Sequence, residues 1–494
     1  MATAAAVEDR TTTPVYALRL WAVRHAGAVE ALYRAMQRAF DVLRPLVRRI
    51  GFERVERPAA ALERLVKGAL FDCRMCGACV LSSTGMACPM NCPKALRNGP
   101  CGGVRDDGGC ELAPQMRCVW IEARQGASRM RAGALPAQPN PPLEHQHVGR
   151  SSWLRVLKQQ PWPAAQVTEA PVRDEIVCGS RLEALLRGGH FVVTSECSPP
   201  DSADARDVVA RTRHYAGWVD ALNVTDAPGA HCHMSSLGVS LILQREGFEA
   251  VMQMTCRDRN RIAIQGDILA AAALGIHHLL CLTGDGITNG DDPGAKPVFD
   301  LDAVSLLDTA RRLRDDGQYR SGRRLSARPR LLLGAVDNPF APPYDERPLR
   351  LARKIAAGAR FVQTQFCFDV AMLERYMVAV RAEGLHRRCA IIVGIGPLTS
   401  ARAARWMRER VPGVHLPESM VARLERATDP AAEGMRICVE TIRRIRAIDG
   451  VAGIHLMAPR REHLIGPIVE ASGVLAGRPA PVQAQGDMPC PLPA

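Results

Sequence analysis

The chain has 494 residues, a hydrophobic fraction of 47%, 17 cysteines and a formal net charge of +13. This length and composition allow two or three globular domains with sizeable cores. The positive charge is spread along the chain without an aromatic-rich basic segment, which excludes nucleic acid as an expected partner.

No segment is long and apolar enough to span a membrane, because the most apolar stretch, 268–282, is short and contains two histidines. The N-terminal sequence MATAAAVEDR lacks the basic start and apolar core of a secretory signal. We therefore expect a cytoplasmic protein, in which cysteines are thiols or metal ligands and not disulfides.

The first predicted element is a helical arm within residues 1–70, with its clearest pattern at 16–50. Apolar residues recur there at steps of mostly three and four, on one face of a helix: Leu18, Trp21, Val29, Leu32, Met36, Phe40, Leu43, Val47 and Ile50. The other face is rich in Arg, which fits a helix on a membrane surface or a packing helix with a solvated back. Acidic Glu30 and Asp41 favour the packing helix.

A cluster of cysteines follows at residues 71–123. Nine of the 17 cysteines are scattered singly over the rest of the chain. The cluster holds the other eight, which are Cys73, Cys76, Cys79, Cys88, Cys92, Cys101, Cys110 and Cys118. Such clustering predicts a small metal-binding module. Eight thiolates suit two [4Fe–4S] clusters, or one cluster and one Zn²⁺, whereas a structural zinc site alone would use four of them.

Residues 124–178 contain the run LPAQPNPP and no strong periodicity, which predicts a Pro-rich linker. From 179 to 478 short apolar runs alternate with helical segments, and a flexible tail is expected at 479–494. The runs that predict strands are 191–195, 221–224, 250–254, 278–282, 331–335, 361–364, 390–394 and 453–457. The helical segments include 262–274, 302–313, 349–357 and 401–410.

Eight strands that alternate with helices predict an α/β fold, a (β/α)8 TIM barrel. A doubly wound open sheet is the alternative, but Glu-Cys-Ser-Pro-Pro follows the first strand where that fold usually has a Gly-rich turn. In a TIM barrel the active residues lie at the C-terminal ends of the strands. The residues at those ends are Glu196, Thr225, Thr255, Asp285, Asn338, Gln365, Gly396 and Arg461.

Two of these strand ends carry carboxyl groups with a chemical interpretation. Glu196 follows an apolar strand, and a partly buried carboxyl group there would have a raised pKa and serve as a general acid. An N-cap or a salt bridge is the alternative. Asp285 lies between Gly284 and Gly286, which let a ligand approach the backbone closely, or which simply form a turn.

Six motifs in this region resemble those of the methylenetetrahydrofolate reductase family and follow the family's order. They are SECSPP at 195–200, NVTDAP at 223–228, MTCRDRN at 254–260, LTGDG at 282–286, ARKIAAGARFVQTQFCFD at 352–369 and GIGPLTS at 394–400. The stretch that opens with CRMCGAC is similar to the module known as the methylenetetrahydrofolate reductase C-terminal domain, which precedes the barrel here.

The resemblance implies a flavin, FAD or FMN, and the reduction of 5,10-methylenetetrahydrofolate to 5-methyltetrahydrofolate in one-carbon metabolism. Glu196 matches the family's catalytic acid, and Asp285 matches a carboxylate near flavin and folate. Gln365 and Arg461 match substrate positions. The positions that match cofactor contacts are Thr225, Gln253, Thr283, Gly284, Asp285, Asn338 and Lys354.

The chain also departs from the family's pattern. Gln253 stands where many members have His, and Arg347 and Arg350 replace an Asp and an Asn that contact the cofactor in better-studied members. These replacements leave the choice between FAD and FMN open.

The two regions together predict an electron inlet, because iron–sulfur clusters carry single electrons and a flavin collects them. The electron donor would be a nicotinamide cofactor or a redox protein. One alternative is a non-catalytic folate-binding or assembly partner with a structural zinc module. Another is the same chemistry in a demethylation pathway. The sequence leaves the oligomeric state open, a homo-oligomer included.

Overall fold

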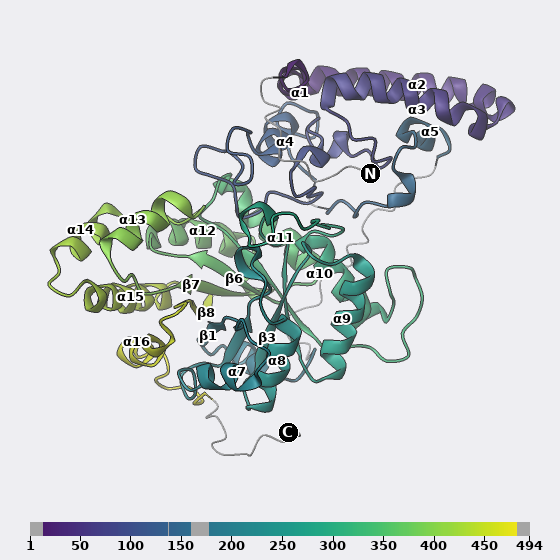
Figure 1. Ribbon diagram of the computed structural model, residues 1–494. Coiled ribbons are helices and arrows are strands. Elements are labelled where there is room, and N and C mark those ends of the chain that lie inside the picture. Colours follow the sequence, from purple (N-terminus) through teal and green to yellow (C-terminus); the bar gives the residue numbers. More distant parts are fainter. Residues whose placement is uncertain (1–12, 137, 160–176, 482–494) are drawn as a thin grey trace. The chain divides into compact units, whose positions relative to one another are not determined.

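A computed structural model describes residues 13–136, 138–159 and 177–481 (Figure 1). Parts of the predicted arm, linker and tail therefore lie outside the described residues. The chain divides into two compact units. The cysteine unit comprises Met1–Thr168 and Lys296–Ser305, and the barrel unit comprises Glu169–Ala295 and Leu306–Ala494.

Three helices begin the cysteine unit: α1 (Pro14–Arg24), α2 (Ala26–Ile50) and α3 (Phe52–Phe71). The periodic segment at 16–50 breaks at His25, where φ is −109° and ψ is 27°. Helices α2 and α3 lie side by side (Figure 1). Between them Gly51 has a φ of +97°, which glycine adopts readily.

The expectation that the apolar face of this segment packs away from solvent is wrong for five of its nine residues. Those exposed residues are Leu18, Trp21, Leu32, Leu43 and Ile50. The other four are half-buried or buried, and they include Val29, which packs against the core of the unit. The two-helix hairpin covers only part of its own apolar surface, and the periodicity in the sequence cannot show how much.

The cysteine-rich segment has little regular structure. It contains 3-10 turns at Leu81–Ser83 and Pro89–Asn91, and it leads into α4 (Val119–Ala127). Later come a 3-10 turn at His145–His147 and α5 (Ser152–Leu157), the latter inside the segment predicted as a linker.

Close packing and buried ion pairs hold these loops together. A Cβ atom at Gly126 would lie 1.8 Å from the carbonyl oxygen of Gly85, so the two backbones meet where only glycine fits. Arg19 of α1 forms a 3.0 Å ion pair with Glu122 of α4, and both side chains are buried. Close backbone packing and a buried ion pair therefore both hold this unit together.

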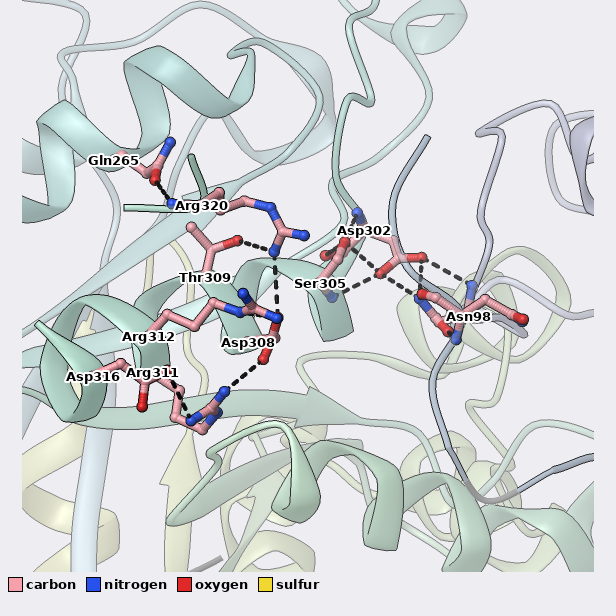
Figure 2. Close-up of polar contacts among 11 residues, drawn as sticks. Asn98, Gln265, Asp302, Ser305, Asp308, Thr309, Arg311, Arg312, Asp316 and Arg320 are labelled. Carbon is pink, nitrogen blue, oxygen red and sulfur yellow. Dashed lines mark hydrogen bonds and ion pairs between the residues drawn. The ribbon is translucent and has the colours of Figure 1, made fainter. Parts of the chain in front are cut away.

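The stretch Lys296–Ser305 ends in the first turn of α10 (Ala303–Arg311). Asn98 binds the carboxylate of Asp302 within the cysteine unit: its backbone N–H donates to Oδ2 at 2.9 Å and its Nδ2 donates to the same oxygen at 3.1 Å (Figure 2). Asp302 also accepts from the backbone N–H of Ser305 at 2.9 Å, which caps the helix.

The remainder of α10 belongs to the barrel unit, where Asp308 gathers three arginine side chains (Figure 2). The carboxylate accepts hydrogen bonds from Arg311 at 3.0 Å, Arg312 at 2.9 Å and Arg320 at 3.3 Å. This cluster fixes the end of α10 and the segment that leads to the fifth strand.

The barrel unit contains a closed sheet of eight parallel strands, which confirms the predicted (β/α)8 fold (Figure 1). The strands are β1 (Val192–Cys197), β2 (Ala221–Val224), β3 (Ala250–Thr255), β4 (His278–Leu282), β5 (Leu332–Asp337), β6 (Phe361–Phe366), β7 (Ala390–Ile395) and β8 (Val451–Leu456). Strand β1 pairs with β8 and closes the barrel. Each strand overlaps one of the eight predicted apolar runs.

Helices follow the strands around the barrel. They are α7 (Ala205–Thr212), α8 (Ser236–Arg245), α9 (Arg261–Ala273), α11 (Arg347–Ala356), α12 (Val370–Ala382), α13 (Ala401–Arg410), α14 (Glu418–Arg426), α15 (Pro430–Arg446) and α16 (Ile465–Ser472). Among the described residues, no helix is long and apolar enough to cross a membrane.

Helix α6 (Arg181–Arg187) closes the N-terminal end of the barrel. Its Leu182, Leu185 and Leu186 pack in one apolar cluster with residues at or near the starts of strands, such as Val192 and Phe361. Because this end is filled with side chains, the opposite, C-terminal end is where a ligand can reach the barrel interior.

Candidate functional site

Glu196 on β1 is the centre of the polar site. Its Oε1 lies 3.5 Å from Nε2 of Gln253 on β3 and 3.5 Å from Nε2 of His455 on β8. The Glu196 side chain is 25% exposed, whereas His455 is buried. The carboxyl group thus reaches solvent, while the amide nitrogen of Gln253 and the ring nitrogen of His455 both lie beside its Oε1.

A buried network of hydrogen bonds supports His455 inside the barrel. Its Nδ1 lies 2.9 Å from Oγ1 of Thr194, which also accepts from Nε2 of Gln363 at 3.1 Å. The amides of Gln363 and Asn223 pair reciprocally at 2.6 and 3.0 Å. These partners fix the imidazole ring, so His455 presents Nε2 to Glu196 in one orientation.

Sequence reasoning missed the four residues of this network, which are Thr194, Asn223, Gln363 and His455. Their signal was present as single polar residues within the apolar runs FVVTS, ALNV, FVQT and GIHLM. A polar side chain in the interior of a buried strand needs a partner, and such partners meet in the centre of a closed barrel.

Gly284 and Asp285 follow β4. Gly284 has a φ of +97°, and a Cβ atom there would lie 3.0 Å from Cβ of Arg257 and 3.1 Å from Cβ of Thr255. The exposed Asp285 accepts a hydrogen bond from the backbone N–H of Gly229 at 2.9 Å. The loops after β2, β3 and β4 therefore meet closely at this rim of the barrel.

The same rim carries two buried polar groups that find no hydrogen-bond partner among the described residues. They are the hydroxyl of Thr225, directly after β2, and Nη1 of Arg257, directly after β3. The other guanidinium nitrogens of Arg257 bind Asp258 at 2.7 Å and the carbonyl oxygen of Ala227 at 3.1 Å. Arg257 lies within the motif MTCRDRN, but sequence reasoning assigned no role to it.

Asp226 holds these loops together. It accepts hydrogen bonds from the backbone N–H of Thr255 at 2.8 Å and from Arg259 at 2.7 Å. Burial alone raises the pKa of Asp226, but the hydrogen bonds and charge of Arg259 outweigh it and keep the pKa below its usual range. The carboxylate therefore stays ionised and joins the loops after β2 and β3 through these hydrogen bonds.

Two predicted cofactor residues are engaged within the protein. The buried ammonium of Lys354 binds Asp337 and the carbonyl oxygen of Val336, each at 2.6 Å, and burial lowers the pKa of Lys354 to about 8. Asn338 donates from Nδ2 to the carbonyl oxygen of Pro412 at 3.3 Å. Both side chains hold the end of β5 in place.

The structure places the remaining predicted residues at separate points of the barrel's C-terminal end. Gln365, the last residue but one of β6, is half-buried, and its Oε1 accepts from the backbone N–H of Phe366 at 3.0 Å. Arg461 is exposed beyond β8. The carbonyl oxygen of Thr283 accepts from the backbone N–H of Cys256 at 3.2 Å. Of the predicted residues, Glu196 and Gln253 are brought into direct contact.

In the cysteine unit, four of the eight predicted metal ligands line a single pocket. These are Cys73, Cys76, Cys79 and Cys88. Burial, with smaller contributions from the neighbouring Cys79 and Cys76, raises the pKa of Cys73 to about 11. Burial and then Cys76, Cys73 and Cys79 likewise raise the pKa of Cys88. We call these four residues the first thiol set.

The other four cysteines influence one another in the same way. Burial and then Cys101 raise the pKa of Cys92, and both also raise the pKa of Cys118 to about 12. Burial raises the pKa of Cys110, and Cys101 contributes. We call Cys92, Cys101, Cys110 and Cys118 the second thiol set. The sequence had left this division of the eight cysteines open.

The donor chemistry of each set fits a metal. Four thiols around a common space are the ligands of a Cys₄ zinc site or a [4Fe–4S] cluster. In the described part of the chain, no three or more Cys, His, Asp or Glu side chains stand in the arrangement of a formed metal site.

Comparison with known families identifies both regions. The family model described as "Methylenetetrahydrofolate reductase" matches residues 181–473, and the model described as "Methylene-tetrahydrofolate reductase C terminal" matches residues 52–146. The chain belongs to the methylenetetrahydrofolate reductase family. Both resemblances seen in the motifs are thereby confirmed.

Curated relatives in the family match the barrel region. A "Probable methylenetetrahydrofolate reductase (NADPH)" of Caenorhabditis elegans is 27% identical over 49% of this chain and 34% of its own length. "Methylenetetrahydrofolate reductase 1" of Schizosaccharomyces pombe is 24% identical over 58% of this chain and 46% of its own length. The "5,10-methylenetetrahydrofolate reductase" of Pectobacterium carotovorum is 26% identical over 58% of this chain and 91% of its own length. The chain thus spans less than half of these two eukaryotic relatives.

Proposed function

We propose that this chain is a flavin-dependent oxidoreductase that reduces 5,10-methylenetetrahydrofolate to 5-methyltetrahydrofolate. Membership of the family supports the reaction class. The observation that carries the proposal is the position of Glu196, which reaches the open end of the barrel while Gln253 and the buried His455 hold its carboxyl group.

Glu196 acts as the proton donor. The methylene bridge of the folate opens when a proton reaches a folate nitrogen as its bond to the bridging carbon breaks, which leaves a cationic iminium group. Glu196 delivers that proton, and its 25% exposure gives the substrate access to the carboxyl group. His455 and Gln253 orient the carboxyl group through Oε1, so that Oε2 faces the substrate.

Asp285 and Gln365 act on the substrate at the rim. The exposed carboxylate of Asp285 places negative charge near the cationic iminium and stabilises it. The amide of Gln365 and the guanidinium of Arg461 bind polar groups of the folate, and Arg461 suits the folate carboxylates.

The flavin would be held at the rim formed by the loops after β2, β3 and β4. The unpartnered groups of Thr225 and Arg257 are donors for an anionic or carbonyl oxygen, and Gly284 leaves room for the backbone to approach it. When bound and reduced, the flavin supplies the hydride. Arg347, which replaces a family cofactor contact, is buried and donates to the carbonyl oxygens of Ala341 and Pro342 at 2.6 Å each.

The two thiol sets would hold [4Fe–4S] clusters, with Zn²⁺ as the alternative for either set. Clusters in these sets would carry electrons singly to the flavin from a nicotinamide cofactor or a redox protein. Anaerobic absorption spectra with metal analysis test this part. Zinc without iron in the anaerobically purified protein contradicts the electron inlet.

The substitution Glu196→Gln tests the reaction. We expect 5-methyltetrahydrofolate formation by the pre-reduced enzyme in a single turnover to fall by at least ~10²-fold, because the proton donor is lost. The bound flavin, measured by absorption, is expected to stay as in the unchanged protein. Glu374→Gln, an exposed change on α12, is the control. Near-normal turnover in Glu196→Gln would overturn the assignment.

A further inference from the structure

Lys67 of α3 is a buried lysine beside the first thiol set. Only 4% of the residue is exposed, and it lines the same pocket as the four thiols of that set. The pocket has an empty volume of about 390 Å³. Because a lysine is rarely buried without a partner for its charge, its position needs a reason in the groups that surround it.

Three neighbours hold the ammonium group of Lys67 at the wall of this pocket. Its Nζ donates to Oε1 of Glu63 at 2.7 Å and to Oγ of Ser152 at 2.8 Å, and it lies 5.3 Å from the centroid of the Trp153 ring. Glu63 in turn accepts from Oγ of Ser151 at 2.7 Å and from the backbone N–H of Trp153 at 3.2 Å. Residues of α3 and of the start of α5 therefore fix the cation in place.

Lys67 and Glu63 are both ionised. Burial lowers the pKa of Lys67, but the neighbouring Cys79 and the carboxylate of Glu63 outweigh it and keep that pKa above its usual range. Burial likewise raises the pKa of Glu63, but the charge of Lys67 and the hydrogen bonds to the carboxylate outweigh it and keep this pKa low. The wall of the pocket therefore presents a positive charge to the first thiol set.

The pocket as a whole carries a surplus of positive charge. Among the described residues, its charged lining groups besides the cysteines are Lys67, Arg97 and Glu63. The guanidinium of Arg97 is buried and donates to the carbonyl oxygens of Ala78 at 3.1 Å and Pro141 at 2.7 Å. Two cations and one carboxylate leave one net positive charge around the four thiols.

The second thiol set has a lysine in a different arrangement. Lys94, two residues after Cys92, is buried and pairs with Glu111 at 2.6 Å. Glu111 follows Cys110 directly in the chain and contributes to the raised pKa of that thiol. This lysine therefore compensates a carboxylate beside the second set, and the pair adds no net charge.

Charge decides how easily a metal site made of thiolates accepts an electron. Four thiolates exceed the positive charge of a [4Fe–4S] core, so the site is negative, and reduction adds one more negative charge. A buried cation nearby stabilises the reduced form more than the oxidised form.

We propose that Lys67 stabilises the reduced form of a [4Fe–4S] cluster in the first thiol set and so raises the reduction potential of that cluster. The proposal rests on the proposed function, because it requires iron in this set. In the step concerned the cluster gains one electron and a reduced redox protein loses one, and no covalent bond forms or breaks.

The test is a redox titration of the anaerobically purified full chain, with its metal and flavin, followed by electron paramagnetic resonance of the reduced clusters. Lys67→Met removes the charge and keeps a long side chain. We expect it to lower the equilibrium constant for reduction of one cluster roughly ten-fold, or about 59 mV. Lys67→Arg keeps the charge and should restore most of that shift.

Glu63→Gln should give a shift of the opposite sign. It removes the negative charge that faces Lys67, so the same midpoint should rise, although by less than ten-fold. General disruption of the pocket would not favour the reduced cluster, so a rise separates charge from packing. This variant also decides the proposal if Lys67→Met fails to retain its iron.

Lys94→Met is the matched control, because it removes a second buried lysine from the same module. The midpoint that responds to Lys67 should stay unchanged in it. Iron-containing protein in which neither Lys67→Met nor Glu63→Gln moves a midpoint, or in which Lys94→Met moves the same midpoint equally, overturns this inference and leaves the proposed function intact. Zinc without iron overturns both, because zinc has no redox chemistry.

Discussion

The barrel unit and the cysteine unit are stabilised in different ways. In the barrel every strand pairs with two neighbours, and an apolar plug from α6 fills its closed end. In the cysteine-rich segment regular structure is sparse, and Cys88 and Cys118 themselves belong to the apolar cores. The comparison indicates that the barrel can form from its apolar pattern, whereas on the proposed function the module would depend on the metal that its thiols would hold.

Removal of single cysteine thiols should show the difference between the two units most strongly. If the two thiol sets hold separate metals, Cys88→Ser removes the metal of the first set and Cys92→Ser that of the second. Each variant should therefore lose about half of the bound metal, and the double variant all of it. Metal binding by such a site is worth on the order of 10 kcal/mol of folding free energy, so the module should also unfold locally. Metal analysis and thiol accessibility measure both effects.

The barrel should not respond to these changes. Flavin content and the unfolding midpoint of the barrel are expected to match those of Cys232→Ser, which alters an exposed cysteine outside both sets. If Cys88→Ser and Cys92→Ser each removed all of the metal, the division into two sets of four would be wrong.

Substitution of one buried lysine in each unit gives a second test, with a smaller expected loss of unfolding free energy. Lys354→Met leaves the buried Asp337 with Tyr376 as its charge-stabilising partner, which should cost about 3–5 kcal/mol of unfolding free energy in the barrel. Lys67→Met in the cysteine unit leaves Glu63 with the hydroxyls of Ser151 and Ser152 and the backbone N–H of Trp153 as donors, so about 1–3 kcal/mol is expected. Urea unfolding followed by circular dichroism and by thiol labelling separates the two units.

A double variant is the control for this pair. Asp337→Leu/Lys354→Met removes both buried charges and should recover part of the lost stability, because no uncompensated carboxylate remains. An equal loss in the single and double variants would show that packing, and not charge, dominates at this site.

The smallest expected effect concerns flavin affinity. Arg257→Met removes the buried guanidinium whose Nη1 has no partner among the described residues. One lost charged hydrogen bond is worth about 1.5–3 kcal/mol, so flavin affinity should fall roughly 10- to 100-fold. Fluorescence titration of the apoprotein measures this change. Arg259→Lys, which keeps a positive charge beside Asp226, should bind flavin more tightly than Arg257→Met, and the reverse order would contradict the cofactor position.

The barrel was predictable from the sequence because every buried strand carries a compact apolar run. The predicted run at 221–224 coincides with β2, and the run at 278–282 coincides with β4. The break of the first helical segment at His25 was not predictable, because the step of eight residues from Trp21 to Val29 is two steps of four and keeps the same helical face. How much of α2 stays exposed depends on tertiary packing, which the pattern of one helix does not contain.

The site was predictable where a residue stands near the end of a strand or at a family motif position, and not where it lies within a strand without such a match. Glu196 and Gln253 follow from strand position or family motif, and the structure brings them together. His455 and Arg257 were not identified from the sequence, because their roles arise from contacts with residues far away in the chain. The division of the cysteines has the same cause: Cys88 and Cys92 are four residues apart, yet they belong to different sets.

The plug that α6 places in the barrel has a kinetic consequence. With the N-terminal end filled by Leu182, Leu185 and Leu186, small molecules enter and leave through the same mouth. A nicotinamide and a folate would then have to take turns there, and an excess of either would inhibit the other. Electrons that arrive through protein-bound metal do not use that entrance, so a donor of this kind would leave folate turnover free of such mutual inhibition.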